Sequence, residues 1–319
     1  MKQKILTVIA LFALGLVTML TTASIVSFAR SEFATAQVFP GSTRSHPDSS
    51  IELENRGRSP SCALKPDSDS AEHRSPTTFI SGPVTLDRFR RNDSNRDRTP
   101  GEPANALGSA KAFDSYTPRE SIALANPTNY GQRYILDLFS RPAEHDPIIV
   151  LHETVFSARS AINTFRTPQS NESKQVSYHA LITLNGDIVY LVPPDFRAFG
   201  AGNSVFQGEK GIETVKTHPN YPPSVNNFAY HVSLETPVDG RNNRSRHSGY
   251  TLAQYKSLAW LVAKTGVPDS RITTHRGVDR SGLRKDPRSF NSATFFRVLQ
   301  SFPRTQDIII SCQSSLDNR

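Results

Sequence analysis

The spacing of apolar residues changes at about residue 130, and from there the chain has the pattern of a folded domain. The run DPIIVLHE at 146–153 is apolar and rich in β-branched residues, which predicts a buried strand that ends at His152. In the segment VFSARSAINTFRTP at 155–168, apolar positions recur at helical spacing and stop before Pro168. This pattern predicts a helix directly after the strand.

Two more strand patterns, VSYHALITL and DIVYLVP, flank Asn185 and Gly186. Asn-Gly between two such runs predicts a hairpin with a type I′ turn, because both central positions of that turn need positive φ. The long segment at 200–227 is rich in Gly, Pro and Asn, and ordered loops of this length usually build sites. The alternating segment FAYHVSLE at 228–235 then predicts another strand.

The C-terminal part predicts two helices and a short strand. Thr251 and Gln254 fit a capping box at the start of an apolar helical face that ends at Gly266. SRITTH predicts a short strand into His275, and NSATFFRVLQSF predicts a last helix. Because strands and helices alternate around one hairpin, we expect the α/β class, with a mixed β-sheet flanked by helices. We place this single domain at 126–303 and a tail at 304–319.

The first 30 residues have the pattern of an export signal. Lys2 and Lys4 precede an apolar, almost uncharged stretch at 5–29, which is also long enough to cross a bilayer. Both a cleaved signal peptide and a membrane anchor remain open. Either one predicts an exported protein, periplasmic or extracellular, which residues 5–29 would hold at the cytoplasmic membrane if the segment is an anchor.

Residues 31–125 are dominated by Ser, Pro, Arg, Asp and Asn, which predicts a disordered polar linker. The run Arg-Phe-Arg-Arg at 88–91 is read as solvated linker, because Asp93 and Asp97 dilute the basic charge that a nucleic-acid site would need. The net charge of +8 favours anionic partners such as lipid headgroups or acidic wall polymers. The only two cysteines, Cys62 and Cys312, are either free or paired in an oxidising compartment.

Three residues of the predicted domain form a candidate metal-ligand set: His152, His275 and Asp286. Two imidazoles and a carboxylate, with the fourth position open, suit a catalytic zinc ion. Taken singly, each residue also has a structural interpretation, since Asp286 could cap a helix or pair with Arg284. Other histidines compete as ligands, namely His179, His218, His231 and His247.

The order of these segments resembles the zinc-dependent N-acetylmuramoyl-L-alanine amidases of the amidase-2 group, which share a superfamily with peptidoglycan recognition proteins and T7-type lysozymes. The resemblance is carried by the strand before His152, by SYHALITLNGDIVYLVP, AGNS, SLE and TTHRG, and by R-K-D-P, and it covers about residues 125–302. It implies a mixed sheet with one Zn²⁺ ion. The implied substrate is peptidoglycan or a muropeptide, cleaved at the amide bond between N-acetylmuramic acid and L-alanine.

Residue by residue, the resemblance implies that His152, His275 and Asp286 bind zinc. It also implies that Glu235 of SLET is the general base, and that Tyr178 of SYH contributes to the site. The proposed chemistry is that zinc activates a water, Glu235 moves its proton, and a cation meets the oxyanion.

The chain departs from the family pattern at two places. Many relatives have His where this chain has Gly200, and many have Lys where it has Arg284, with Lys285 next to it. Either Arg284 or Lys285 could therefore meet the oxyanion. The complete ligand set favours an enzyme, and the alternative is a catalytically silent peptidoglycan-binding module of the same fold.

Overall fold

The computed structural model describes residues 61–66, 80, 83–91 and 116–311. The helices are α2 (Ala158–Arg166), α3 (Leu252–Ala263), α4 (His275–Val278) and α5 (Ser292–Leu299). The strands are β1 (Cys62–Ala63), β2 (Glu120–Ile122), β3 (Tyr130–Gly131), β4 (Arg133–Tyr134), β5 (Ile148–Glu153), β6 (Ala180–Ile182), β7 (Ile188–Tyr190), β8 (Arg197–Ala198), β9 (Phe206–Gly208), β10 (Gly211–Glu213), β11 (Ala229–Leu234) and β12 (Ile272–Thr274).

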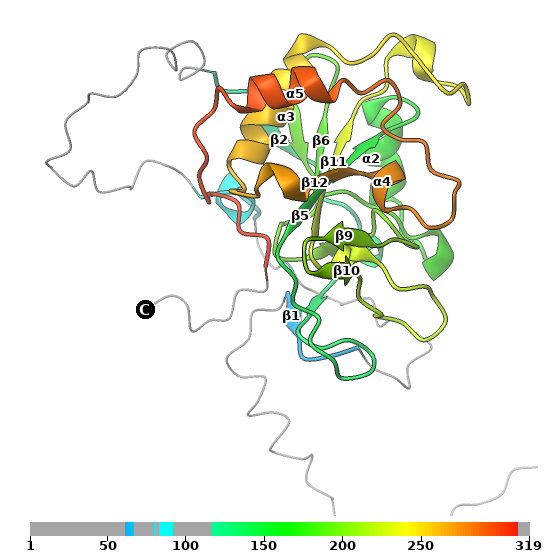
Figure 1. Ribbon diagram of the computed structural model, residues 1–319. Coiled ribbons are helices and arrows are strands. Elements are labelled where there is room, and N and C mark those ends of the chain that lie inside the picture. Colours follow the sequence, from blue (N-terminus) through cyan, green and yellow to red (C-terminus); the bar gives the residue numbers. More distant parts are fainter. Residues whose placement is uncertain (1–60, 67–79, 81–82, 92–115, 312–319) are drawn as a thin grey trace, which may run out of the picture. The chain divides into compact units, whose positions relative to one another are not determined.

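The main sheet has six strands in the order β12-β5-β11-β6-β7-β2 (Figure 1). The four strands from β12 to β6 are parallel, β7 is antiparallel to β6, and β2 is parallel to β7. Every residue of β5 and β11 is buried, as expected for central parallel strands that are covered on both faces. The predicted mixed sheet of an α/β domain is thereby confirmed.

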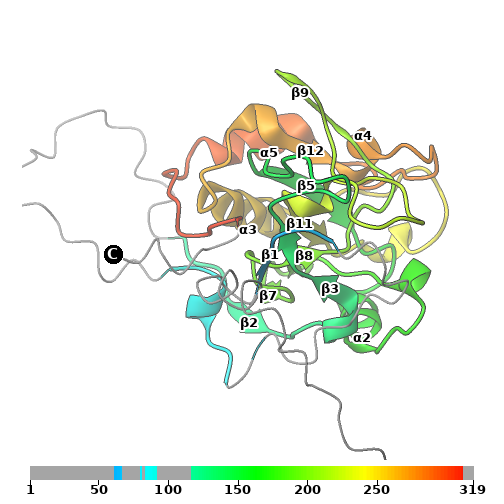
Figure 2. The same ribbon diagram turned by 90° about the horizontal axis from the view of Figure 1, so that it is seen from below.

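Helices cover both faces of this sheet. α3 and α5 lie together on one side and α2 lies on the other (Figures 1 and 2). The larger core is formed where α3 and α5 pack on side chains such as Leu151, Val232 and Tyr190. A smaller core joins Phe165 of α2 to Leu181 on the opposite face. Alternate residues of each strand therefore belong to different cores.

Capping side chains fix the helix starts close to the predicted positions. Ser157 accepts from Ser160 N at α2, and Asn291 accepts from Thr294 N at α5. At α3, Thr251 and Gln254 form both hydrogen bonds of the predicted capping box. The predicted strand at SRITTH ends one residue earlier than expected, because Thr274 caps a short helix that begins with His275.

The hairpin between β6 and β7 is present, but its turn differs from the predicted type I′ turn. Of the two residues at the turn, Gly186 has a positive φ, of 86°, and Asn185 does not have a positive φ. Gly186 N donates to Thr183 O, and Thr183 N donates to Asp187 O. A three-residue loop with a left-handed glycine after the turn gives these bonds, so Asn185 does not need the left-handed conformation.

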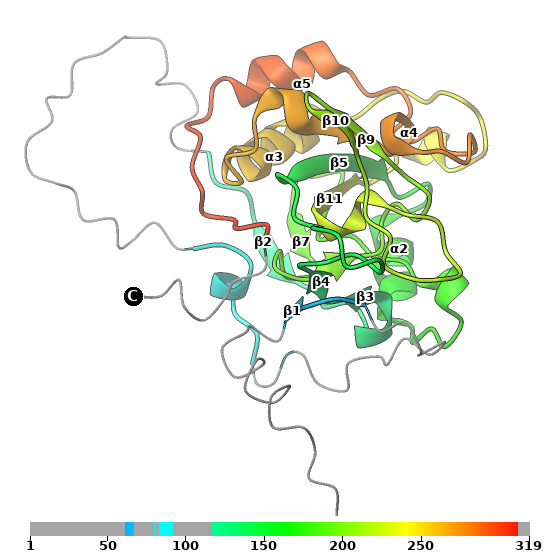
Figure 3. The ribbon, with the colours of Figure 1, turned by 60° about the horizontal axis from the view of Figure 1, so that its bottom comes forward.

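Parts of the predicted linker pack against the domain, in contrast to the expectation for 31–125. β2 is the edge strand of the main sheet, and β1 pairs with β4 (Figure 3). Phe89, expected to be solvated, is 1% exposed and stacks on Tyr190 with 4.9 Å between ring centroids. Arg90 pairs with Glu120 at 2.6 Å. The average polarity of the stretch concealed these apolar and paired residues.

The predicted tail also joins the domain, because Ile308 and Ile310 are buried in the larger core and Lys264 pairs with Asp307 at 2.9 Å. Cys62 is disulfide-bonded, and Cys312 lies outside the described residues. Residues 1–30, predicted as a signal or an anchor, also lie outside them. Within the described ranges, no helix is long and apolar enough to cross a membrane.

Candidate metal centre

His152, His275 and Asp286 converge, as the sequence predicts. One potential ligand atom from each lies within 4.8 Å of the other two. Asp286 Oδ2 is 3.3 Å from His152 Nδ1 and 3.0 Å from His275 Nδ1. Because both histidines present Nδ1 to the same carboxylate oxygen, one small cation between them could contact all three residues.

The sheet register explains why the two histidines meet. β12 and β5 are parallel neighbours, and Thr274 pairs with Leu151. The next residue on each strand is a histidine, so His275 at the start of α4 lies beside His152, with 4.6 Å between ring centroids. Asp286 reaches the pair from the loop after α4, and its backbone oxygen accepts from Arg276 N at 3.0 Å.

The protonation states of these groups suit a cation. Burial lowers the pKa of His152 to about 4, against the opposing effect of Asp286. Burial alone would raise the pKa of Asp286, but its contacts with His152 and His275 hold the pKa well below its usual range. A neutral imidazole and an ionised carboxylate therefore face each other, which is the state in which both groups bind metals.

An unsatisfied buried atom marks the place for the ion. Within the described residues, His152 Nδ1 has no hydrogen-bond partner, although the side chain is fully buried. The other ring nitrogen, Nε2, lies 2.9 Å from His231 Nδ1. If Nε2 carries the proton of that bond, Nδ1 points a lone pair at an anionic oxygen, an arrangement that needs a cation between them. The residues present therefore fit a bound zinc ion.

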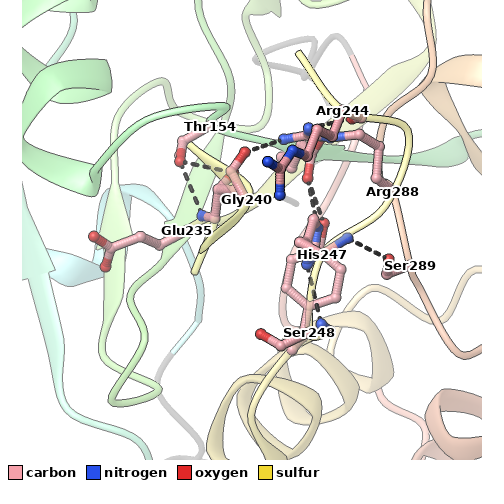
Figure 4. A network of polar contacts seen from close by, with 12 residues as sticks. Thr154, Glu235, Gly240, Arg244, His247, Ser248, Arg288 and Ser289 are labelled. Carbon is pink, nitrogen blue, oxygen red and sulfur yellow. Dashed lines mark hydrogen bonds and ion pairs between the residues drawn. The ribbon is translucent and has the colours of Figure 1, made fainter. Parts of the chain in front are cut away.

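A buried ion pair holds the segments that carry two of the ligands. Arg288, two residues after Asp286, donates to Glu153, the residue after His152. Its guanidinium also donates to the backbone oxygens of Gly240 and Arg244, as Figure 4 shows. His247 and Tyr250 bind the same Glu153 carboxylate at 3.0 and 2.9 Å. The network connects β5, the 236–249 loop and the Asp286 segment, and no feature of the sequence had pointed to it.

A cleft of about 410 Å³ is lined by one of the three candidate ligands, His275. Tyr178, His275 and Arg284 line it, together with much of the 200–227 segment, which was expected to build a site. Tyr178 stacks on His152 with 4.4 Å between ring centroids. Burial raises the pKa of Tyr178, as does the charge of Asp286, so its hydroxyl remains a donor.

The two neighbouring cations occupy different places. Arg284 lines the cleft, and its positive charge opposes protonation of His152. Lys285 is exposed and does not line this cleft; it lines a second hollow, which Arg284 and Asp286 also line. Arg284 is thus the cation that shares the cleft with His275.

Glu235 lies one residue beyond β11, and its predicted role as general base stays a prediction. Its carboxylate accepts hydrogen bonds from Ala158 N and Leu184 N, both at 3.0 Å, and from Arg241 at 3.2 Å. Glu235 is not among the residues that line the cleft, and Figure 4 shows its carboxylate turned away from the Arg288 network. These bonds join β11 to the start of α2 and to the β6–β7 hairpin, which favours a structural contribution.

The competing histidines have other partners. His179 Nδ1 accepts from His231 N at 2.9 Å, and His247 pairs with Glu153. His218 lies in the wall of the cleft, 3.1 Å from Glu172. His231 contacts His152 without belonging to the ligand cluster. Among the described residues, the only group of at least three His, Cys, Asp or Glu side chains that could hold a metal is the predicted one.

Fold and site together define a mixed α/β domain with a candidate His-His-Asp metal site, whose two histidines lie at the ends of parallel strands. Residues 145–289 match the family model Amidase_2, described as N-acetylmuramoyl-L-alanine amidase. This part of the domain is therefore similar to that family. None of the curated proteins compared with the chain gives a significant match.

Several solved structures are similar to the chain. A selenomethionine derivative of AmpD is 23% identical, with coverage of 57% of this chain and 94% of that one and a TM-score of 0.39. The amidase LysC of Clostridium intestinale is 18% identical, with coverage of 58% and 99% and a TM-score of 0.36. Escherichia coli AmiD, in complex with its substrate anhydro-N-acetylmuramic acid-L-Ala-D-γ-Glu-L-Lys, is 20% identical, with coverage of 49% and 57% and a TM-score of 0.35.

Proposed function

We propose that this protein is a zinc-dependent N-acetylmuramoyl-L-alanine amidase, which hydrolyses the amide bond between N-acetylmuramic acid and L-alanine of peptidoglycan stem peptides. The observation that carries the proposal is the buried Nδ1 of His152, which has no hydrogen-bond partner among the described residues and faces Asp286 Oδ2 at 3.3 Å. The third candidate ligand, His275, lines an open cleft. The match of residues 145–289 to the Amidase_2 family model supports the reaction class.

In the proposed mechanism, His152, His275 and Asp286 hold one Zn²⁺ ion. When bound, zinc supplies a Lewis acid for the scissile carbonyl and a nucleophile near neutral pH. Arg284 lines the cleft beside His275, so its guanidinium is the group we assign to the developing oxyanion. The Tyr178 hydroxyl is a second donor, because its raised pKa keeps it protonated. We assign no catalytic step to Lys285, and the general-base role of Glu235 stays a prediction.

The substrate class of the proposal is a muropeptide or peptidoglycan, since the structure of Escherichia coli AmiD is a complex with a muropeptide. We also propose that residues 1–30 direct export, so that the domain acts outside the cytoplasmic membrane. The packed segments described above support a domain that begins before residue 126 and ends after residue 303. The alternative function, a silent peptidoglycan-binding module, is disfavoured by the complete ligand set.

The test is to purify the mature chain, remove metal, restore zinc and incubate the protein with a soluble muropeptide and with intact sacculi. Mass spectrometry should detect the released stem peptide only with zinc present. Binding of the muropeptide without release, in zinc-loaded protein, would instead support the silent module. The two substrates also reveal which size of substrate the cleft accepts.

Two matched variants test which of the adjacent cations, Arg284 or Lys285, stabilises the oxyanion. Arg284→Ala should lower kcat by about a hundredfold, the usual cost of removing one oxyanion donor, while Lys285→Ala should change it by less than about threefold. Equal effects of the two substitutions, or a larger effect of Lys285→Ala, would contradict the assignment of Arg284.

A further inference from the structure

His231 lies in the middle of β11, fully buried, with its imidazole between a metal ligand and a glycine. Its Nδ1 is 2.9 Å from His152 Nε2. On the other side is Gly200: a Cβ added there would lie 2.5 Å from His231 Nδ1 and 2.6 Å from its Cγ. The ring of His231 therefore occupies the space that any larger residue at position 200 would need.

The hydrogen bond between the two imidazoles has a definite direction if His152 binds a metal through Nδ1. A ligating Nδ1 has no proton, so the single proton of neutral His152 is on Nε2 and is donated to His231 Nδ1. His231 then carries its own proton on Nε2. Metal-binding histidines usually donate their second nitrogen to an acceptor that fixes the ring and its tautomer, and here the acceptor is an imidazole.

The acceptor is itself held in place. The backbone N–H of His231 donates to His179 Nδ1 at 2.9 Å, and the two rings stack with 5.7 Å between centroids and 10° between planes. His179 Nε2 lies 3.1 Å from Phe196 O. His231 thus has a fixed backbone, a stacked ring on one side and a glycine on the other, so that its Nδ1 lone pair stays directed at His152.

We propose that His231 is a positioning residue of the metal centre, which orients His152 and fixes its tautomer, and that Gly200 is required because it leaves room for this imidazole. The inference deepens the proposed function and rests on the metal site assigned there. His231 does not ligate the ion: the ligand cluster consists of His152, His275 and Asp286.

The test compares two side chains of similar shape. His231→Leu removes the acceptor, whereas His231→Asn places an amide oxygen near the position of Nδ1. Zinc affinity, measured by competition with a chromophoric chelator, should fall about 10- to 100-fold in the Leu variant. The Asn variant should lie within about threefold of the parent protein. The absorption spectrum of the cobalt-substituted protein should change in the Leu variant and be restored in the Asn variant.

Gly200→Ala provides an independent variant if the Leu variant does not fold, because it keeps every polar group but displaces the ring. It should also weaken zinc binding by at least about tenfold. Equal zinc affinity of the Leu variant and the parent, or an Asn variant as weak as the Leu variant, would overturn the inference. If the parent protein itself binds no zinc, the proposed function fails, which is a different outcome.

Discussion

The two faces of β5 and β11 differ in how well their buried groups are satisfied. On the face under α3, Ile149, Leu151 and Val232 pack into an apolar core with almost no exposed surface. On the opposite face, His152 Nδ1, His231 Nε2 and Ser233 Oγ are buried and, among the described residues, have no hydrogen-bond partner. Neighbouring residues of one strand thus pack an apolar core on one face and carry the candidate metal site on the other.

The difference indicates where the chain gives up stability for function. An apolar side chain gains free energy simply by leaving water, whereas an unpartnered polar atom costs free energy until a ligand satisfies it. Natural structures leave few such atoms, and among these three His152 Nδ1 is the one that an ion bound by His152, His275 and Asp286 would satisfy. Substitutions on the two faces should therefore affect different measurements.

The largest effect on stability is expected at the ion pair that joins the two regions. Arg288→Met leaves the Glu153 carboxylate buried without its guanidinium, and should lower the free energy of unfolding by about 3–5 kcal/mol. Urea denaturation of the metal-free protein measures this, with Lys285→Met, an exposed neighbour, as the control. A loss below about 1 kcal/mol would mean that the network does not hold the Asp286 segment.

On the apolar face, Ile149→Ala should lower the free energy of unfolding by about 2–5 kcal/mol, because it opens a cavity in a fully buried core. The zinc affinity of the folded protein should stay within about threefold of the parent. Denaturation curves and chelator competition on the same sample check both expectations. Weaker zinc binding with unchanged stability would break the distinction between the two faces.

Glu235→Gln tests whether this carboxylate is structural. Replacing one carboxylate oxygen by an amide that cannot accept from an N–H donor should lower the free energy of unfolding by about 1–3 kcal/mol. Stem-peptide release by the folded variant should fall by less than about tenfold. A fall of about 100- to 10,000-fold with unchanged stability would instead identify Glu235 as the general base.

The smallest effect is expected at the edge of the domain, at Glu213. The hydrogen bond from Arg271 lowers the pKa of Glu213 below its ordinary value, so the pair stabilises the fold when the carboxylate is ionised. This contribution is present above the unfolded-state pKa of about 4.3 and is lost as pH falls through the lower folded-state pKa.

Glu213→Gln should therefore reduce stability at neutral pH by less than about 1 kcal/mol, because solvent screens a half-buried pair. The variant should also lose less stability than the parent between neutral pH and pH 3. Thermal melts over that range measure the difference, and Glu209→Gln, an exposed carboxylate on the same hairpin, is the control. A parent and variant with parallel pH profiles would show that the pair contributes nothing.

The sequence predicted most of the elements that carry the site, because their signals are local. The β-branched run before His152 and the capping box at Thr251 each identify an element within about ten residues. The three ligands followed from their residue types, their places after strands or in a loop, and the family resemblance. The meeting of His275 with His152 depends on the pairing of β12 with β5, which the local pattern does not specify.

Long-range packing explains what the sequence could not predict. Phe89 and Ile308 lie in polar segments, and only the fold brings them to the core. Glu153 and Arg288 are 135 positions apart, so neither local sequence indicates that the two side chains form an ion pair. His231 appeared only as a competing ligand, because its role depends on the space left by Gly200.

The measurement that tests the central claim most directly is zinc binding by the parent protein and by Asp286→Ala, followed in parallel with stem-peptide release. The parent should bind about one zinc per chain and should lose at least about a thousandfold in rate when zinc is removed, which corresponds to several kcal/mol of transition-state stabilisation. The Asp286→Ala variant should fold but lose both metal and activity. Full activity in zinc-free protein, or unchanged zinc binding by the variant, would contradict the assignment of His152, His275 and Asp286 as the catalytic metal site.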